Sequence, residues 1–119
     1  MAPYERLLAW QRAHALTLRI YALSRTWPAD ERFGLISQVR RAAASVPTNI
    51  AEGAAKRGSS EFRRFLDIAL GSQTEVRYLL QLAGDLGYLA EEECDAILDE
   101  AEEAGRLLWG LYRSMKAKA

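Results

Sequence analysis

Hydrophobic positions recur every three or four residues along nearly the whole chain, which is the spacing of one face of an α-helix. Pro28, Gly58 and Gly87 lie in the breaks of this pattern. The pattern predicts four helices, over about residues 4–26, 31–53, 60–86 and 90–116. Because the connections are short, we expect an all-α fold, an up-and-down antiparallel four-helix bundle that spans residues 1–119 as a single domain.

The first predicted helix carries two hydrophobic stripes. One stripe contains Leu7, Trp10, His14, Leu18 and Tyr21, and the second contains Ala9, Ala13, Leu16, Ile20, Leu23 and Trp27. Two stripes exceed what a helix of a monomeric bundle needs to bury. Either this helix is deeply inserted in its own bundle, or the second stripe faces another subunit.

The second predicted helix contains a proline within its hydrophobic seam. The seam consists of Ile36, Val39, Ala43, Val46, Ile50 and Gly53. Pro47 cannot donate a backbone hydrogen bond, and its ring clashes with the carbonyl of Ala43, so we expect a kink there. Asp30 is a good N-cap residue and is expected to start this helix.

Cap residues also predict the ends of the later helices. Ser59 or Ser60 is expected to cap the third helix, and Gly87 is expected to end it. Glycines at positions 71, 84, 105 and 110 lie inside predicted helices, where each costs about 1 kcal/mol relative to alanine. We therefore expect some of them to permit close helix approach, and some to lie at an interface.

The net charge of zero hides a strong asymmetry. Residues 1–58 carry nine basic and four acidic side chains, and residues 59–119 carry seven basic and twelve acidic ones. The halves therefore have net charges of +5 and −5. A local basic face could contact nucleic acid, and the acidic half could equally pair with the basic half of a neighbouring subunit.

The composition favours a cytoplasmic protein. The single cysteine, Cys94, excludes an internal disulfide and a cysteine-based metal site. The N-terminus has no apolar signal core, and no run of about 18 apolar residues could span a membrane. We expect Cys94, which lies on the apolar seam of the fourth helix, to be a buried structural thiol.

No catalytic or metal-binding pattern is present in the sequence. Di-iron bundles need a Glu-x-x-His motif on two helices, whereas this chain has one histidine, His14, without a glutamate three residues before it. The common nucleophile, phosphate-loop and dinucleotide motifs are absent as well. We therefore predict no catalytic residue, no metal and no cofactor. The alternative is an enzyme with an unrecognised carboxylate site.

The least ordinary segment extends from Arg40 to Gly53. The polar residues at positions 41, 45, 49, 52 and 56 follow a spacing that places them on one helix face. This face could be a polar contact surface. Alternatively, Ser45 and Asn49 satisfy backbone groups freed by Pro47, and Glu52 pairs with a neighbouring helix.

These residues resemble the 23S ribosomal RNA intervening-sequence proteins, also called four-helix bundle proteins. The resemblance covers residues 7 to about 112 and is carried by Ala9-Trp10-Gln11, Gln38-Val39-Arg40-Arg41-Ala42-Ala43, Ser45-Val46-Pro47-Thr48-Asn49-Ile50-Ala51-Glu52-Gly53 and Leu86-Gly87-Tyr88-Leu89. The resemblance implies a bacterial, cytoplasmic bundle that assembles into a homopentamer.

The same resemblance extends more distantly to the accessory variability protein of diversity-generating retroelements. That relative is a pentameric barrel that engages RNA and a reverse transcriptase. In this chain the matching motif residues Ser45, Pro47, Asn49, Glu52 and Gly53 are then expected to have structural or interface roles.

Two functional hypotheses follow for a non-catalytic oligomer. In the first, a basic patch around the second helix and the following loop binds RNA or another nucleic acid. The residues proposed for this contact are Arg40, Arg41, Lys56, Arg57, Arg63 and Arg64. In the second hypothesis, the protein is a scaffold in which basic and acidic halves pair between subunits.

Overall fold

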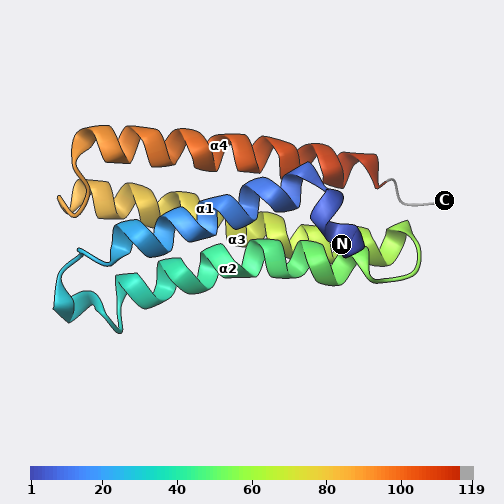
Figure 1. The fold of residues 1–119 in the computed structure, drawn as a ribbon, viewed down its shortest axis with the longest axis horizontal. Helices are drawn as coiled ribbons and strands as arrows, with labels where there is room; N and C mark the ends of the chain where they lie inside the picture. Colours follow the sequence, from blue (N-terminus) through green and yellow to red (C-terminus); the bar gives the residue numbers. More distant parts are fainter. Residues whose placement is uncertain (116–119) are drawn as a thin grey trace.

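Four antiparallel α-helices dominate the computed structural model, which describes residues 1–115 (Figure 1). The helices are α1 (Leu8–Ser24), α2 (Leu35–Ala54), α3 (Ser59–Asp85) and α4 (Glu91–Ser114). Two short 3-10 helices, η1 (Pro3–Arg6) and η2 (Ala29–Glu31), precede α1 and α2. Each of α1 and α3 packs against both α2 and α4, so the predicted up-and-down bundle is confirmed.

The first two helices are shorter than the sequence predicts. Leu7 has an extended backbone and separates η1 from α1, where one helix from residue 4 was expected. Gly34, and not Asp30, occupies the N-cap position of α2, so the predicted cap is wrong. The Oε1 atom of Glu31 accepts a hydrogen bond from the backbone N–H of Leu35 at 3.1 Å, and this bond satisfies a free donor at the helix start.

The later helices match their predicted spans more closely. Gly58 is the N-cap residue of α3, so neither predicted serine occupies that position. At the other end Gly87 has φ of 81°, and the N–H of Tyr88 donates to the carbonyl of Ala83 at 2.9 Å. This pattern is a Schellman motif, which confirms the predicted glycine cap. The end predicted for the fourth helix, residue 116, lies outside the described residues.

The hydrophobic core is built from one stripe of α1 and the seams of the other helices. Ala13, Leu16 and Ile20 of the second stripe are buried, so the interpretation that this stripe faces another subunit is wrong. The first stripe is the one left outside, with Leu18 59% and Tyr21 41% exposed. The interpretation that α1 is deeply inserted is therefore correct for the second stripe, whereas the first stripe lies on the surface.

The proline in α2 is accommodated by a side chain from α1. α2 continues through Pro47 as one helix, and the Ala43 carbonyl has no N–H of residue 47 to accept. The Thr17 hydroxyl lies 3.0 Å from this carbonyl and 2.8 Å from that of Ala13, and both contacts are buried. Ser45 and Asn49, which the sequence suggested for this task, bond to other atoms. Thr17 therefore links α1 to α2 at the proline.

Two glycines are explained by close packing within the chain. A Cβ on Gly84 would lie 2.5 Å from the Sγ of Cys94, and one on Gly53 would lie 2.8 Å from Phe62. By contrast, a Cβ on Gly71 or Gly110 would meet no atom within 4 Å. The expected close approach therefore holds for Gly84 and does not account for Gly71 or Gly110.

Candidate nucleic-acid interface

The six basic residues predicted to bind nucleic acid separate into two groups. Arg40 and Arg41 lie in the first half of α2, whereas the other four lie at or after its end, around the connection to α3 (Figure 1). At about 1.5 Å per residue, Arg40 is about 21 Å along the helix axis from Ala54. The structure therefore does not bring all six residues into one patch.

Arg40 is committed to contacts within the bundle. Its Nε donates to the Ser24 hydroxyl at 2.9 Å, and its Nη2 donates to the Tyr21 carbonyl at 3.2 Å. The guanidinium also lies 4.7 Å from the centre of the Tyr21 ring. These contacts satisfy groups at the C-terminal end of α1. Arg41 is exposed and donates to the hydroxyl of Ser37 at 3.0 Å.

The remaining four residues, Lys56, Arg57, Arg63 and Arg64, form what we call the basic end. Phe65 lies between two of them, with the Lys56 ammonium 5.3 Å and the Arg64 guanidinium 5.0 Å from the ring centre. The guanidinium of Arg63 lies 4.3 Å from the centre of the Tyr112 ring of α4, and both residues line a small hollow with Arg64. These are cation–π distances, so aromatic rings hold three of the four cations at the surface.

One carboxylate offsets part of the charge at the basic end. Arg64 forms an ion pair with Glu61 at 3.2 Å, and this hydrogen bond lowers the pKa of Glu61 and raises that of Arg64. Lys56, Arg57 and Arg63 have no ion-pair partner within residues 1–115. A second carboxylate, Asp67, lines a hollow with Arg63 and Arg64. With Glu61 and Asp67 both counted against the four cations, the basic end keeps a net positive charge.

An aromatic pair from α4 extends this site. Tyr112 stacks on Trp109, with ring centres 5.4 Å apart and an angle of 15° between the planes, and Trp109 is 49% exposed. Sequence analysis missed both residues because they lie about fifty positions after Arg63. The available signal was Trp109 itself, a large aromatic residue beside the buried Leu108 of the helix seam.

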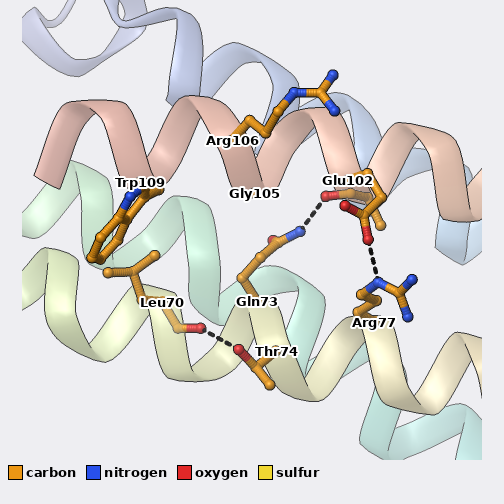
Figure 2. Close-up of a pocket in the computed structure, with 9 residues that line it drawn as sticks. Leu70, Gln73, Thr74, Arg77, Glu102, Gly105, Arg106 and Trp109 are labelled. Carbon is orange, nitrogen blue, oxygen red and sulfur yellow. Dashed lines mark hydrogen bonds and ion pairs between the residues drawn. The ribbon is translucent and has the colours of Figure 1, made fainter. Parts of the chain in front are cut away.

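A mainly apolar hollow between α3 and α4 adjoins the exposed tryptophan (Figure 2). Its volume is about 310 Å³, with Leu70 and Trp109 at one end and the ion pair of Arg77 with Glu102 at the other. Gln73 on its floor donates from Nε2 to the Ala101 carbonyl at 2.8 Å.

The charge asymmetry of the sequence is partly resolved inside the chain. Three arginines pair with glutamates of α4 in the same chain. The pairs are Arg12 with Glu103, Arg19 with Glu100, and Arg77 with Glu102. The acidic α4 therefore engages basic residues of its own bundle, and fewer of its carboxylates remain for a neighbouring subunit.

The motif residues of α2 have mainly structural contacts. The Nδ2 of Asn49 donates to the Ser45 carbonyl at 2.8 Å, and the Ser45 hydroxyl lies 2.9 Å from that of Ser72 on α3. Glu52 is exposed and takes part in none of the ion pairs of the described chain, so the alternative in which it pairs with a neighbouring helix of the same chain has no support here. A shallow groove beside Glu52 also contains Trp10, which stacks on His14 at 4.9 Å.

No catalytic site is evident in the part of the chain that the structure describes. Within residues 1–115, no three or more His, Cys, Asp or Glu side chains gather as a metal-binding group would. Cys94 is half-buried against Gly84, and burial raises the pKa of its thiol. The same residues contain no helix that is long and apolar enough to cross a membrane.

Architecture and surface together define an all-α four-helix bundle protein without an evident catalytic centre. The family model for the 23S rRNA-intervening sequence protein matches residues 5–110, so the chain belongs to that family, as the sequence resemblance predicted. No curated protein matches the sequence.

The fold is also seen in a crystal structure of a protein with unknown function from the S23 ribosomal protein family of Bacteroides thetaiotaomicron VPI-5482. The TM-score is 0.80 at 22% sequence identity, over 89% of this chain and 96% of that chain. At this identity the similarity shows a shared fold.

Proposed function

We propose that this protein binds RNA, without catalysis, through the basic end and the adjoining aromatic pair. The observation that carries the proposal is the convergence of Lys56, Arg63 and Arg64 on surface rings. Cations at such a surface contact phosphates, and an exposed indole such as Trp109 provides a platform for a base. Single-stranded loops of RNA offer both groups together.

The ion pairs within the chain weaken the scaffold alternative only in part. Glu100, Glu102 and Glu103 of α4 pair with arginines of their own chain, whereas its other five carboxylates form no ion pair among the described residues. The basic end, by contrast, retains cations without carboxylate partners. The unpaired charge is therefore mainly positive at this surface, which suits a polyanion.

We further propose that the protein acts as a homo-oligomer, with the exposed stripe of α1 as the subunit interface. Leu18 and Tyr21 lie on this stripe, and the stacked Trp10 and His14 continue it. The family resemblance leads us to expect a pentamer. Repetition of the basic end around a ring would strengthen RNA binding through multivalency.

The test is the salt dependence of binding to a fluorescent RNA stem-loop, measured by anisotropy. The variant Lys56→Gln/Arg57→Gln is expected to bind more weakly. The slope of log affinity against log salt should also fall by about 0.7 to 0.9 for each lost phosphate contact. The matched control is Arg41→Gln, an exposed arginine of α2 away from the basic end, whose slope should stay unchanged.

A second variant separates stacking from charge. Trp109→Ala should weaken binding to a stem-loop while leaving the salt slope unchanged, because it removes a ring and no cation. Absence of binding at low salt, or a wild-type slope in the Lys56→Gln/Arg57→Gln variant, would show that the basic end is not the contact.

A further inference from the structure

A basic hollow is lined by residues from the end of α1, the following connection and the first half of α2. This end of the bundle is opposite to the connection between α2 and α3, where the basic end lies (Figure 1). The volume of the hollow is about 420 Å³. The residues that line it are Ser24, Arg25, Trp27, Ala29, Arg32, Ile36 and Arg40. Only Arg40 belongs to the basic patch predicted above as the nucleic-acid contact, and none of the seven belongs to the basic end.

Three arginines line this hollow without a carboxylate partner, and the guanidinium of Arg32 also lies 6.0 Å from the centre of the exposed Phe33 ring. Arg25, Arg32 and Arg40 form no ion pair within the described chain. By contrast, the two arginines within α1, Arg12 and Arg19, each pair with a glutamate of α4. Like charges gathered in one hollow repel each other, and an anion bound among them would remove that repulsion.

Arg40 is held in a fixed orientation within the hollow. Ser24, which is fully buried, accepts from its Nε, and the Tyr21 carbonyl accepts from its Nη2. These bonds use two of the five N–H donors of a guanidinium and leave the others for a ligand. A pre-oriented guanidinium matches the oxygen spacing of a phosphate group.

A buried indole forms part of the wall of the hollow. Trp27 lines the hollow and is 4% exposed. Its Nε1 is closed off from solvent and has no hydrogen-bond acceptor among the described residues, so the indole N–H is not a ligand that the hollow offers. Because the indole borders the hollow, its N–H signal can report an anion that binds among the arginines.

Two carboxylates of the adjoining loop, Glu31 and Asp30, lie near the hollow, and Glu31 is engaged elsewhere. Glu31 accepts hydrogen bonds from the Leu35 N–H at 3.1 Å and from the Tyr88 hydroxyl at 2.8 Å. The charge of Asp30 is close enough to Tyr88 to help raise the pKa of that phenol. Neither carboxylate pairs with an arginine of the hollow.

We propose that this hollow binds the phosphate group of a phosphate monoester, with Arg25, Arg32 and Arg40 as the cationic ligands. The site is separate from the basic end and does not depend on RNA binding there. Free phosphate and a nucleoside monophosphate share this chemistry, and the experiment below distinguishes them.

The experiment follows the indole N–H signals of the nitrogen-15-labelled full chain by NMR at constant ionic strength. The chain has three tryptophans, and Trp27→Phe assigns the signal of interest. Inorganic phosphate, adenosine monophosphate and adenosine are titrated in turn. We expect the Trp27 signal to move saturably with a phosphate-bearing probe and to stay in place with adenosine. Saturation by the nucleotide alone would identify a monoester site that also needs the nucleoside.

Variants of the exposed arginines test the assignment without disturbing the core. Arg25→Gln and Arg32→Gln should each raise the dissociation constant about tenfold, the loss of one charge-assisted contact. Arg113→Gln, an exposed arginine of α4, is the matched control and should leave it unchanged. Asp30→Asn should tighten binding, because it removes a nearby negative charge; impaired folding would not produce this gain.

Several outcomes would overturn the proposal. These are a shift that never saturates, an equal shift with chloride, or a wild-type dissociation constant in both arginine variants. A chemical shift of the Trp27 indole N–H that stays constant with every phosphate probe would also reject the proposal. The variant Lys56→Gln/Arg57→Gln should retain phosphate binding even if it loses RNA, so failure of one proposal can be told from failure of the other.

Discussion

At the scale of single residues, the Thr17 hydroxyl replaces a hydrogen-bond donor that α2 lacks at Pro47, although Thr17 belongs to another helix. Pro47 removes the usual donor for the Ala43 carbonyl, and Thr17 lies 3.0 Å from that carbonyl. Proline inside a helix is recognisable from sequence, but the identity of its partner is not. That partner is separated from Ala43 by 26 positions and depends on how α1 and α2 dock.

Thr17→Val should destabilise the fold by about 1 to 3 kcal/mol, because it leaves a buried carbonyl without a donor while keeping the side-chain shape. The free energy of unfolding in urea is the measurement. Thr48→Val, at an exposed position of the same bundle, should change it by less than about 0.5 kcal/mol.

A double-mutant cycle tests the physical reason for this effect. Pro47→Ala restores the backbone N–H that can reach the Ala43 carbonyl, so the cost of Thr17→Val should be smaller in that background. Equal costs in both backgrounds would show that Thr17 acts through packing and not through the freed carbonyl.

At the scale of elements, hydrophobic spacing predicts the four helices well and their ends less well. The seam of α2 is buried from Ile36 to Gly53 as its spacing predicts. The start of α2 differs because Glu31 bonds to the Leu35 N–H, a contact that depends on the chain fold around Gly34. The basic end was predictable as charge, whereas its aromatic part was not, because Trp109 and Tyr112 come from α4.

The connections at one end of the bundle are joined by a single hydrogen bond. The Tyr88 hydroxyl, after α3, donates to Glu31, before α2, at 2.8 Å. This bond is the largest cause of the raised pKa of Tyr88 above its ordinary value of 10.0. The folded pKa exceeds the unfolded one, so the contribution to stability is full below pH 10.0 and is lost as pH rises through the folded value.

In the variant Tyr88→Phe, the free energy of unfolding should therefore fall less steeply as pH rises through the pKa of Tyr88. The free energy of unfolding is measured from neutral pH to above the ordinary tyrosine pKa for the variant and the wild type. Tyr78→Phe, on an exposed tyrosine of α3, should keep the wild-type profile. An unchanged profile in Tyr88→Phe would mean that the bond to Glu31 does not set this pH dependence.

At the scale of the whole molecule, the isolated bundle leaves an apolar stripe of α1 on its surface. Leu18→Glu should convert the proposed oligomer to monomers, because a charge would be buried at the interface. Sedimentation equilibrium gives the mass directly. Ile68→Glu places the same charge at a similarly exposed site on α3, where 48% of the residue is accessible, and should leave the mass unchanged. A wild-type mass for Leu18→Glu would place the interface elsewhere.

The contact between Thr17 and the Ala43 carbonyl also bears on the order in which the bundle folds. A peptide of residues 35–54 lacks α1, so the carbonyl freed by Pro47 has only water as a partner. The free energy of forming the helix is therefore less favourable in its middle turn than within the bundle. We infer that α2 becomes regular only as α1 docks on it, and that the two helices form as one cooperative unit. Amide exchange should then show α1 and the middle of α2 opening together.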